Sequence, residues 1–156
     1  MDIVINASPL ILLGKINRLD LLNRLFSKVY IPSAVLQEVQ AIDKSQMELK
    51  LSDITFERLN VTNKIAVRGL LGRLHQGEVE VMVGALEKGV LTVVLDESAA
   101  RNKAKQLGLE ATGTLGILLK AHKQGLIDDV LQEIDKLKQE GMYLSDSIIE
   151  KIKSSL

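Results

Sequence analysis

Short apolar runs rich in β-branched residues alternate with segments of helical periodicity along most of this 156-residue chain. The run Ile3-Val4-Ile5 opens the pattern, and residues 90–95 (VLTVVL) give its clearest strand signal. Helices that connect parallel strands also cover the faces of their sheet, so strict alternation is typical of α/β proteins. The sequence therefore predicts an α/β fold with a mainly parallel central sheet.

The expected elements follow from periodicity, caps and chain breakers. Strands are predicted at 3–5, 29–31, 90–95 and 109–111, and helices at 10–15, 19–25, from Pro32 onward, 65–74, 79–86, 98–107, 114–123, 128–139 and 145–154. Residues 41–60 are charged and mixed, and no order is predicted for them. With no linker or repeat, residues 1–156 are expected to form one domain, with appended helices from about residue 127 to 156.

Composition excludes several classes of protein. No apolar run is long enough to span a bilayer, and no signal peptide is evident at the N-terminus. The absence of cysteine excludes disulfides and thiolate metal sites and fits a cytoplasmic location. A formal net charge of zero gives no global attraction to nucleic acid, so binding would need a local patch or a bridging metal. The low aromatic content argues against a base-stacking platform.

Four polar positions interrupt apolar runs at equivalent places: Asn6, Glu38, Glu78 and Asp96. The first and last follow predicted strands, and the two glutamates lie in the first turns of predicted helices. Strand C-termini and the helix N-termini after them share one rim of an open parallel sheet, where ligands bind. Carboxylates gathered there repel one another unless a cation lies between them, and Mg²⁺ and Mn²⁺ favour such oxygen ligands.

Each of these residues also has a purely structural interpretation. Asn6 can cap a helix, and Glu38, Glu78 and Glu80 can be ordinary first-turn acids favoured by the helix dipole. Asp96 or Glu97 can cap the helix that begins near Ser98. His75 is more simply interpreted as a surface residue than as a ligand.

Taken together, several segments resemble the PIN-domain superfamily, and within it the prokaryotic DUF3368 branch. They are Asn6-Ala7-Ser8-Pro9-Leu10, Ile31-Pro32-Ser33 with Glu38, Gly77-Glu78-Val79-Glu80, Leu95-Asp96-Glu97 with Arg101, Thr112-Gly113-Thr114-Leu115-Gly116 and Gly141-Met142-Tyr143-Leu144-Ser145. Each motif alone is weak, but their order and spacing cover nearly the whole chain. The resemblance implies a three-layer α/β/α fold.

The resemblance also implies a divalent-metal-dependent ribonuclease, related to the toxins of toxin–antitoxin pairs. The catalytic, metal-binding positions would be Asn6, Glu38, Glu78 and Asp96, with Glu80 and Glu97 as alternates and Mg²⁺ or Mn²⁺ as cofactor. Ser8, Arg101 and Lys103 would contact substrate. The implied partners are single-stranded RNA, a small antitoxin protein and a second copy of the chain, and no membrane is expected.

Asn6 departs from the family pattern, which has aspartate at the first acidic position. An amide oxygen can ligate a hard cation but carries no charge. One charge pair at ~4 Å is worth about 1 kcal/mol in water and about 4 kcal/mol at an effective dielectric of about 20. The alternative is therefore a weakened PIN-like protein that binds nucleic acid or a partner without cutting. The apolar stripe Val130, Leu131, Ile134 and Leu137 is a candidate dimer face.

Overall fold

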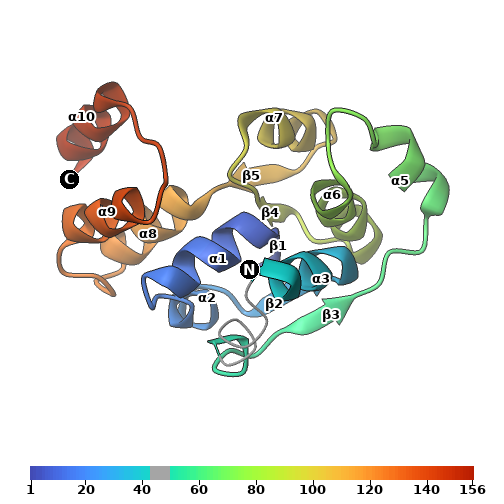
Figure 1. Ribbon diagram of the computed structural model, residues 1–156, viewed down its shortest axis with the longest axis horizontal. Coiled ribbons are helices and arrows are strands. Elements are labelled where there is room, and N and C mark those ends of the chain that lie inside the picture. The colour runs from blue at the N-terminus through green and yellow to red at the C-terminus, as the bar shows by residue number, and fades with distance from the viewer. Residues whose placement is uncertain (43–49) are drawn as a thin grey trace.

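A five-stranded parallel sheet forms the centre of the protein, whose computed structural model describes residues 1–42 and 50–156 (Figure 1). The strand order is β3-β2-β1-β4-β5, and every adjacent pair is parallel. The strands are β1 (Asp2–Ile5), β2 (Lys28–Pro32), β3 (Glu57–Leu59), β4 (Thr92–Val94) and β5 (Glu110–Thr112). The chain runs outward from β1 to β3, then crosses back to β4, so the direction of strand order reverses between β1 and β4.

Helices join these strands and cover both faces of the sheet, which confirms the three-layer α/β/α expectation (Figure 1). They are α1 (Ala7–Lys15), α2 (Asp20–Leu25), α3 (Ser33–Ile42), α5 (Lys64–Leu70), α6 (Gln76–Lys88), α7 (Ser98–Gln106), α8 (Thr114–Lys123), α9 (Val130–Gln139) and α10 (Asp146–Ser155). Helix α6 packs on β1, β2 and β4, the middle of the sheet.

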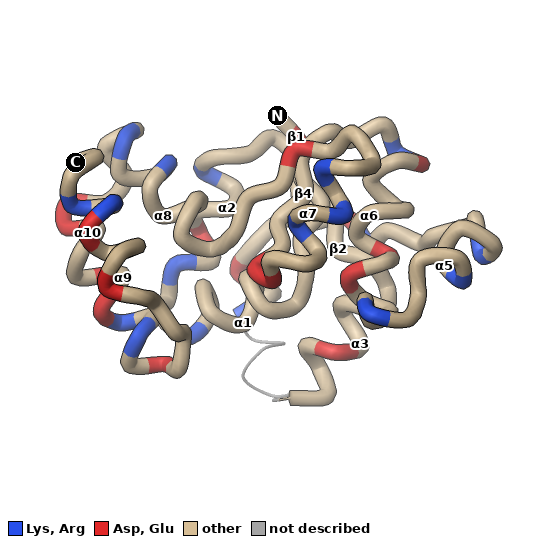
Figure 2. Tube along the Cα trace, turned by 90° about the horizontal axis from the view of Figure 1, so that it is seen from above, with Lys and Arg blue, Asp and Glu red and all other residues tan. Residues whose placement is uncertain are grey.

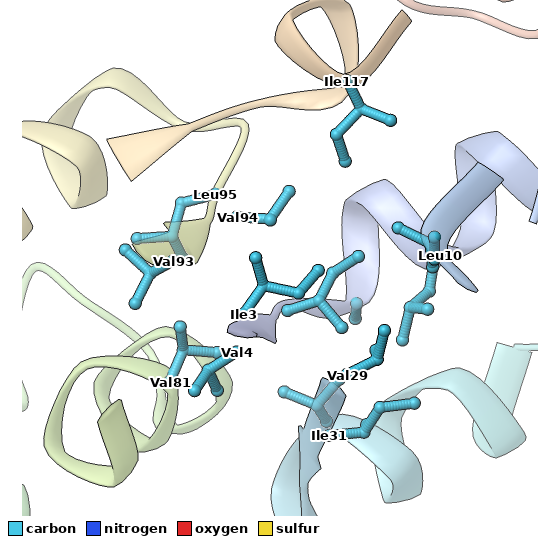
Figure 3. Close-up of a cluster of buried hydrophobic side chains, with 14 of the residues drawn as sticks. Ile3, Val4, Leu10, Val29, Ile31, Val81, Val93, Val94, Leu95 and Ile117 are labelled. Carbon is cyan, nitrogen blue, oxygen red and sulfur yellow. The ribbon is translucent and has the colours of Figure 1, made fainter. Parts of the chain in front are cut away.

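The core is built by alternation along the central strands. Val4 of β1 and Val93 of β4 are register partners and lie beside Val81 of α6 (Figure 3). Ile3 points to the opposite face, toward Leu10 of α1 (Figure 3). All five side chains are inaccessible to solvent. A strand buried on both faces needs apolar residues at every position, which explains why β1 has no polar alternation.

Most predicted elements are confirmed within a few residues, and the differences have physical causes. Strand β3 lies in the segment for which no order was predicted, because the edge strand Glu57-Arg58-Leu59 buries only Leu59 and so lacks an apolar run. The strand predicted at 90–95 is shorter, since only Thr92–Val94 pair with neighbours. Helix α5 ends at Leu70 rather than 74, because Leu71 is extended and Gly72 has φ of +137°.

The C-terminal helices α9 and α10 lie with α8 at one end of the molecule, opposite α5 (Figure 1). Glu133 of α9 is 3 % exposed and accepts a hydrogen bond from Arg18 Nη2 at 2.8 Å. Basic and acidic residues are interspersed over α9 and α10 (Figure 2). The apolar stripe proposed as a dimer face is not available as such: Val130, Ile134 and Leu137 are buried within their own chain.

Among the described residues, no helix is both long and apolar enough to cross a bilayer.

Candidate functional site

The candidate site lies at the rim where β1 and β4 end side by side. Asn6 follows β1 and its backbone N–H donates to the Val94 carbonyl at 3.0 Å, so it extends the ladder by one residue. Asp96 lies two residues after β4. Strand order reverses between these two strands, and the crevice at such a switch point is where open α/β sheets bind ligands. The fold thus brings together two residues that are 90 positions apart.

Asn6 is not the helix cap that one interpretation expected. It occupies the N-cap position of α1, but its side chain makes no capping hydrogen bond. The residue is 6 % exposed, and Oδ1 is buried without a hydrogen-bond partner among the described residues. A buried amide oxygen left unpaired costs free energy, so such an atom requires an explanation such as a ligand or water.

Gly77 opens space between the candidate ligands. A Cβ at this position would lie 3.0 Å from Glu38 Oε2, 3.3 Å from Asn6 Oδ1 and 3.3 Å from His75 Cε1. The exposed Glu38 carboxylate of α3 therefore reaches over the start of α6 to the buried amide. Because glycine has no side chain, Gly77 leaves space for the side chains of Glu38, Asn6 and His75. The sequence pattern alone did not reveal this role.

Glu78, in the first turn of α6, is 2 % exposed. Its Oε1 lies 2.7 Å from His75 Nε2, whereas Oε2 is buried and unpaired among the described residues. Burial raises the pKa of this carboxyl, and the negative charges of Glu97 and Glu38 raise it further, while His75 opposes them. His75 is half exposed, in line with its interpretation as a surface residue, and it contacts a candidate ligand.

Asp96 is held by three donors. Its Oδ1 accepts the Thr114 backbone N–H at 2.7 Å, and Oδ2 accepts the hydroxyls of Thr114 at 2.8 Å and Ser8 at 3.0 Å. A Cβ on Gly113 would lie 2.8 Å from Oδ1, so this glycine permits the close approach. Asp96 thus joins the starts of α1 and α8. It does not cap the helix that follows it; that N-cap position belongs to Glu97, which makes no capping bond.

The two alternate positions differ in their surroundings. Glu80 accepts hydrogen bonds from the Ala34 backbone N–H at 3.2 Å and from Gln76 Nε2 at 2.8 Å, so one of its oxygens is engaged at the start of α3 and the other within α6. Glu97 is exposed, and its charge acts on Glu78. Of the two, Glu97 is the one whose carboxylate has no hydrogen-bond or ion-pair partner within the part of the chain that the structure describes, and its charge is felt by Glu78.

The two predicted phosphate contacts also differ. Arg101 donates to the carbonyls of Leu95 and Asp96 and to Ser98 Oγ, so its guanidinium fixes the turn after β4. Lys103 lines an open groove of about 490 Å³ between α5 and α7, together with Arg73. Basic positions are visible along α7 in Figure 2. This basic groove offers two cations to a polyanion without contacting the acidic centre.

A second groove, of about 440 Å³, contains Ser8, Glu38 and Asp96 on one side. Its opposite wall is residues 140–143, which connect α9 to α10. The C-terminal extension therefore borders the candidate site, which the order of motifs in the sequence did not predict.

The donor set fits a hard cation with one qualification. The oxygens of Asn6 and Glu78 that lack a partner among the described residues, and the Glu38 carboxylate near Asn6, are of the neutral and anionic types that Mg²⁺ and Mn²⁺ accept. Within residues 1–42 and 50–156, however, no three His, Cys, Asp or Glu side chains converge closely enough to hold a metal on their own. The amide oxygen of Asn6, or an inward movement of the exposed Glu38, is needed to complete the set.

Comparison with known proteins gives the family. A family model described as DUF3368, PIN domain, matches residues 2–156. A solved structure of a PilT N-terminus domain protein from the hyperthermophilic archaeon Sulfolobus solfataricus P2 is similar with a TM-score of 0.56 and 21% identity. The similarity covers 78% of this chain and 93% of that one. Comparison with curated proteins found no match. PIN domains are generally nucleases that use divalent metal ions. With a match over almost its whole length, this chain belongs to the DUF3368 family of PIN domains.

Proposed function

We propose that this chain is a divalent-metal-dependent ribonuclease that cleaves single-stranded RNA at the rim between β1 and β4. The proposal is carried by two oxygens, Asn6 Oδ1 and Glu78 Oε2, that are buried without a partner among the described residues. The Glu38 carboxylate acts near both: its Oε2 and Asn6 Oδ1 border the same space at Gly77, and its charge raises the pKa of Glu78. An uncompensated polar cluster of this kind reduces stability, and a cation would offset that cost.

The ligands would be Asn6, Glu38 and Glu78, with Asp96 at the edge of the set and Glu97 as its alternate. When bound, Mg²⁺ or Mn²⁺ stabilises negative charge on the phosphoryl oxygens and lowers the pKa of a water molecule. Hydrolysis adds the water oxygen to phosphorus, breaks one P–O ester bond and leaves the proton on the departing oxygen.

The other residues bind and orient. Asp96 accepts the hydroxyl of Ser8 and so fixes that side chain at the groove floor. Lys103 and Arg73 provide positive charge for phosphates farther along the RNA chain. These local cations supply the attraction that a net charge of zero does not.

The test is cleavage of a mixed single-stranded RNA pool with Mn²⁺. Wild-type activity that Glu78→Gln reduces at least about 100-fold supports the proposal, because the amide keeps the shape of the side chain but loses the charge of the ligand. Glu150→Gln is the matched control: this glutamate is 74% exposed on α10, and the variant should cleave like wild type. Equal cleavage by wild type and Glu78→Gln would exclude Glu78 as a ligand.

A second candidate function follows from Asn6. With a neutral first ligand, the chain can be a weakened relative that binds RNA or a protein partner without cutting. Cleavage by Asn6→Asp but not by wild type would favour this function. If neither wild type nor Asn6→Asp cleaves RNA, the nuclease proposal is rejected for the RNAs tested. The first proposal extends to a toxin role for the ribonuclease. Inhibition of its RNA cleavage by the protein encoded by an adjacent small gene would test that role.

A further inference from the structure

We propose that the groove between α1 and residues 140–143 binds one nucleobase of a single-stranded RNA, stacked on the ring of Tyr143. This inference rests on the proposed function, since it names the substrate subsite next to the catalytic rim. The groove of about 440 Å³ is within the range of small-molecule sites and contains Glu38 and Asp96 as well as Tyr143. A nucleotide whose phosphate lies at those carboxylates through a cation would have its base in the same groove.

Tyr143 is unusual among the aromatic residues of this protein. The chain has two Tyr, two Phe and no Trp, and all four aromatics lie in the described residues. Tyr30 and Phe26 are buried and Phe56 is half-buried, whereas Tyr143 is 88% exposed. A low aromatic content argued against a stacking platform, but the fold places its one exposed ring on the wall of the candidate site. One ring is sufficient to stack one base.

The connection that carries Tyr143 is anchored on both sides. Before it, the Met142 backbone N–H donates to the Leu137 carbonyl at 3.0 Å, and Gly141 adopts φ of +102° to close α9. After it, Leu144 is buried, and Ser145 Oγ caps α10 by accepting the Ile148 backbone N–H at 3.3 Å. A backbone fixed on both sides of Tyr143 needs little further ordering when a base binds, which favours stacking on its ring.

Charge decides which part of a nucleotide lies at this end of the groove. Glu140 adds a carboxylate to the wall that carries Tyr143, and half-buried Ile11 and Leu12 face it from α1. A phosphate would be repelled by Glu140, whereas a base is uncharged and has two apolar faces. The groove therefore favours a base here and leaves the phosphates to the cation and to the basic groove that contains Lys103.

The test is binding of a short single-stranded RNA that carries the fluorescent base 2-aminopurine, with Ca²⁺ in place of Mg²⁺ as the oxygen-binding cation and with the RNA checked to be intact after the titration. Tyr143→Ala should raise Kd about tenfold, equivalent to about 1.4 kcal/mol, and remove the quenching that stacking causes. Tyr143→Phe should retain both, because the ring and not the hydroxyl carries the interaction. Ile148→Ala, an exposed apolar residue on α10 outside the groove lining, is the matched control and should bind like wild type.

An RNA with abasic nucleotides separates stacking from a general loss of affinity. Wild type and Tyr143→Ala should bind it equally, since no base is present to stack. Equal Kd of wild type and Tyr143→Ala for the intact RNA would overturn the proposal, and so would a failure of Tyr143→Phe to restore binding.

The two proposals fail differently. If wild type cleaves RNA with Mn²⁺ and Tyr143→Ala has the same KM and kcat, the base subsite is wrong and the nuclease remains. If wild type quenches 2-aminopurine through Tyr143 but does not cleave, the subsite stands and the nuclease fails. If wild type neither binds nor cleaves RNA, both proposals are rejected.

Discussion

Glu78 in α6 and Glu133 in α9 are buried to almost the same degree, 2 % and 3 % exposed, yet their surroundings act on them in opposite directions. Burial raises the pKa of Glu78, and the nearby carboxylates Glu97 and Glu38 raise it further. The hydrogen bond from Arg18 lowers the pKa of Glu133, and Lys136 contributes in the same direction. One site gathers like charge, and the other pairs opposite charge.

The difference separates a structural role from a functional one. Each glutamate has an unpaired buried Oε2 in the described part of the chain, so an orphaned oxygen alone does not distinguish them. The identity of the neighbours does: Glu133 is paired with Arg18 and Lys136, whereas the carboxylates of Glu97 and Glu38 act on Glu78. The amide oxygen of Asn6, which lacks a partner among the described residues, lies by Gly77, the residue before Glu78. Only the second arrangement gains stability from an added cation.

The largest expected effect is on stability, and it tests the structural half of the comparison. Glu133→Gln should lower the free energy of unfolding by about 2 kcal/mol, because it leaves Arg18 and Lys136 without their carboxylate; partial exposure of Arg18 keeps the cost below that of a deeply buried pair. Denaturant unfolding measures it. Glu150→Gln, which loses only an exposed pair with Lys153 at 3.8 Å, should change stability by less than about 0.5 kcal/mol. Equal free energies of unfolding for Glu133→Gln and Glu150→Gln would show that the buried Glu133 pair stabilises the protein no more than an exposed pair does.

Adding a negative charge at residue 6 should increase the difference between the candidate metal site and the compensated site at Glu133. Asn6→Asp should tighten Mn²⁺ binding at least about tenfold, since it supplies one further anionic ligand at a buried position. It should also destabilise the metal-free protein through repulsion with Glu38, whose carboxylate borders the same space at Gly77. Titration calorimetry measures the first effect and thermal unfolding the second. Asn63→Asp adds the same charge at the N-cap of α5, away from the candidate site, and should leave Mn²⁺ affinity unchanged. Unaltered Mn²⁺ affinity of Asn6→Asp would place residue 6 outside the site.

A steric change at the same place should have a smaller effect. Gly77→Ala places a methyl group 3.0 Å from Glu38 Oε2 and 3.3 Å from Asn6 Oδ1, so these side chains must move apart. We expect Mn²⁺ affinity to fall about fivefold, or about 1 kcal/mol. Gly69→Ala is the control, because nothing lies within 4 Å of its added Cβ and alanine favours the helix. A Gly77→Ala protein with the Mn²⁺ affinity of wild type would show that Glu38 and Asn6 do not depend on the space at Gly77 to bind metal.

The smallest expected effect is the dependence of stability on pH, which should have opposite signs at the two glutamates. The folded-state pKa of Glu78 is raised, so wild type should lose stability relative to Glu78→Gln as pH rises from about 4.5 through that raised pKa. The pKa of Glu133 is lowered, so the advantage of wild type over Glu133→Gln should be present above about pH 4.5 and disappear as pH falls through the folded pKa. Unfolding measured from pH 3 to 8 checks both, and curves of equal sign would contradict the comparison.

Much of the candidate site could be predicted because its residues follow apolar runs. Asn6 directly follows β1, Asp96 ends the apolar run that contains β4, and parallel strands end on one rim. The contact of Thr114 with Asp96 could not be predicted, because no periodicity relates a helix start to a strand end 18 residues earlier. The contact of His75 with Glu78 joins residues three positions apart at the start of α6, a spacing that the sequence does contain. The position of Tyr143 could not be predicted either, because its exposure depends on how α9 and α10 pack.

The sequence by itself determined the α/β class, the parallel sheet and the family, because hydrophobic periodicity and the order of short motifs are local properties of the chain. It did not determine which glutamate oxygens are paired, which glycine leaves room for ligands, or that residues 140–143 border the site. Those depend on distances between segments far apart in sequence. Burial and charge compensation arise only when the sheet and its helices have brought these segments together, and therefore only the tertiary structure decided them.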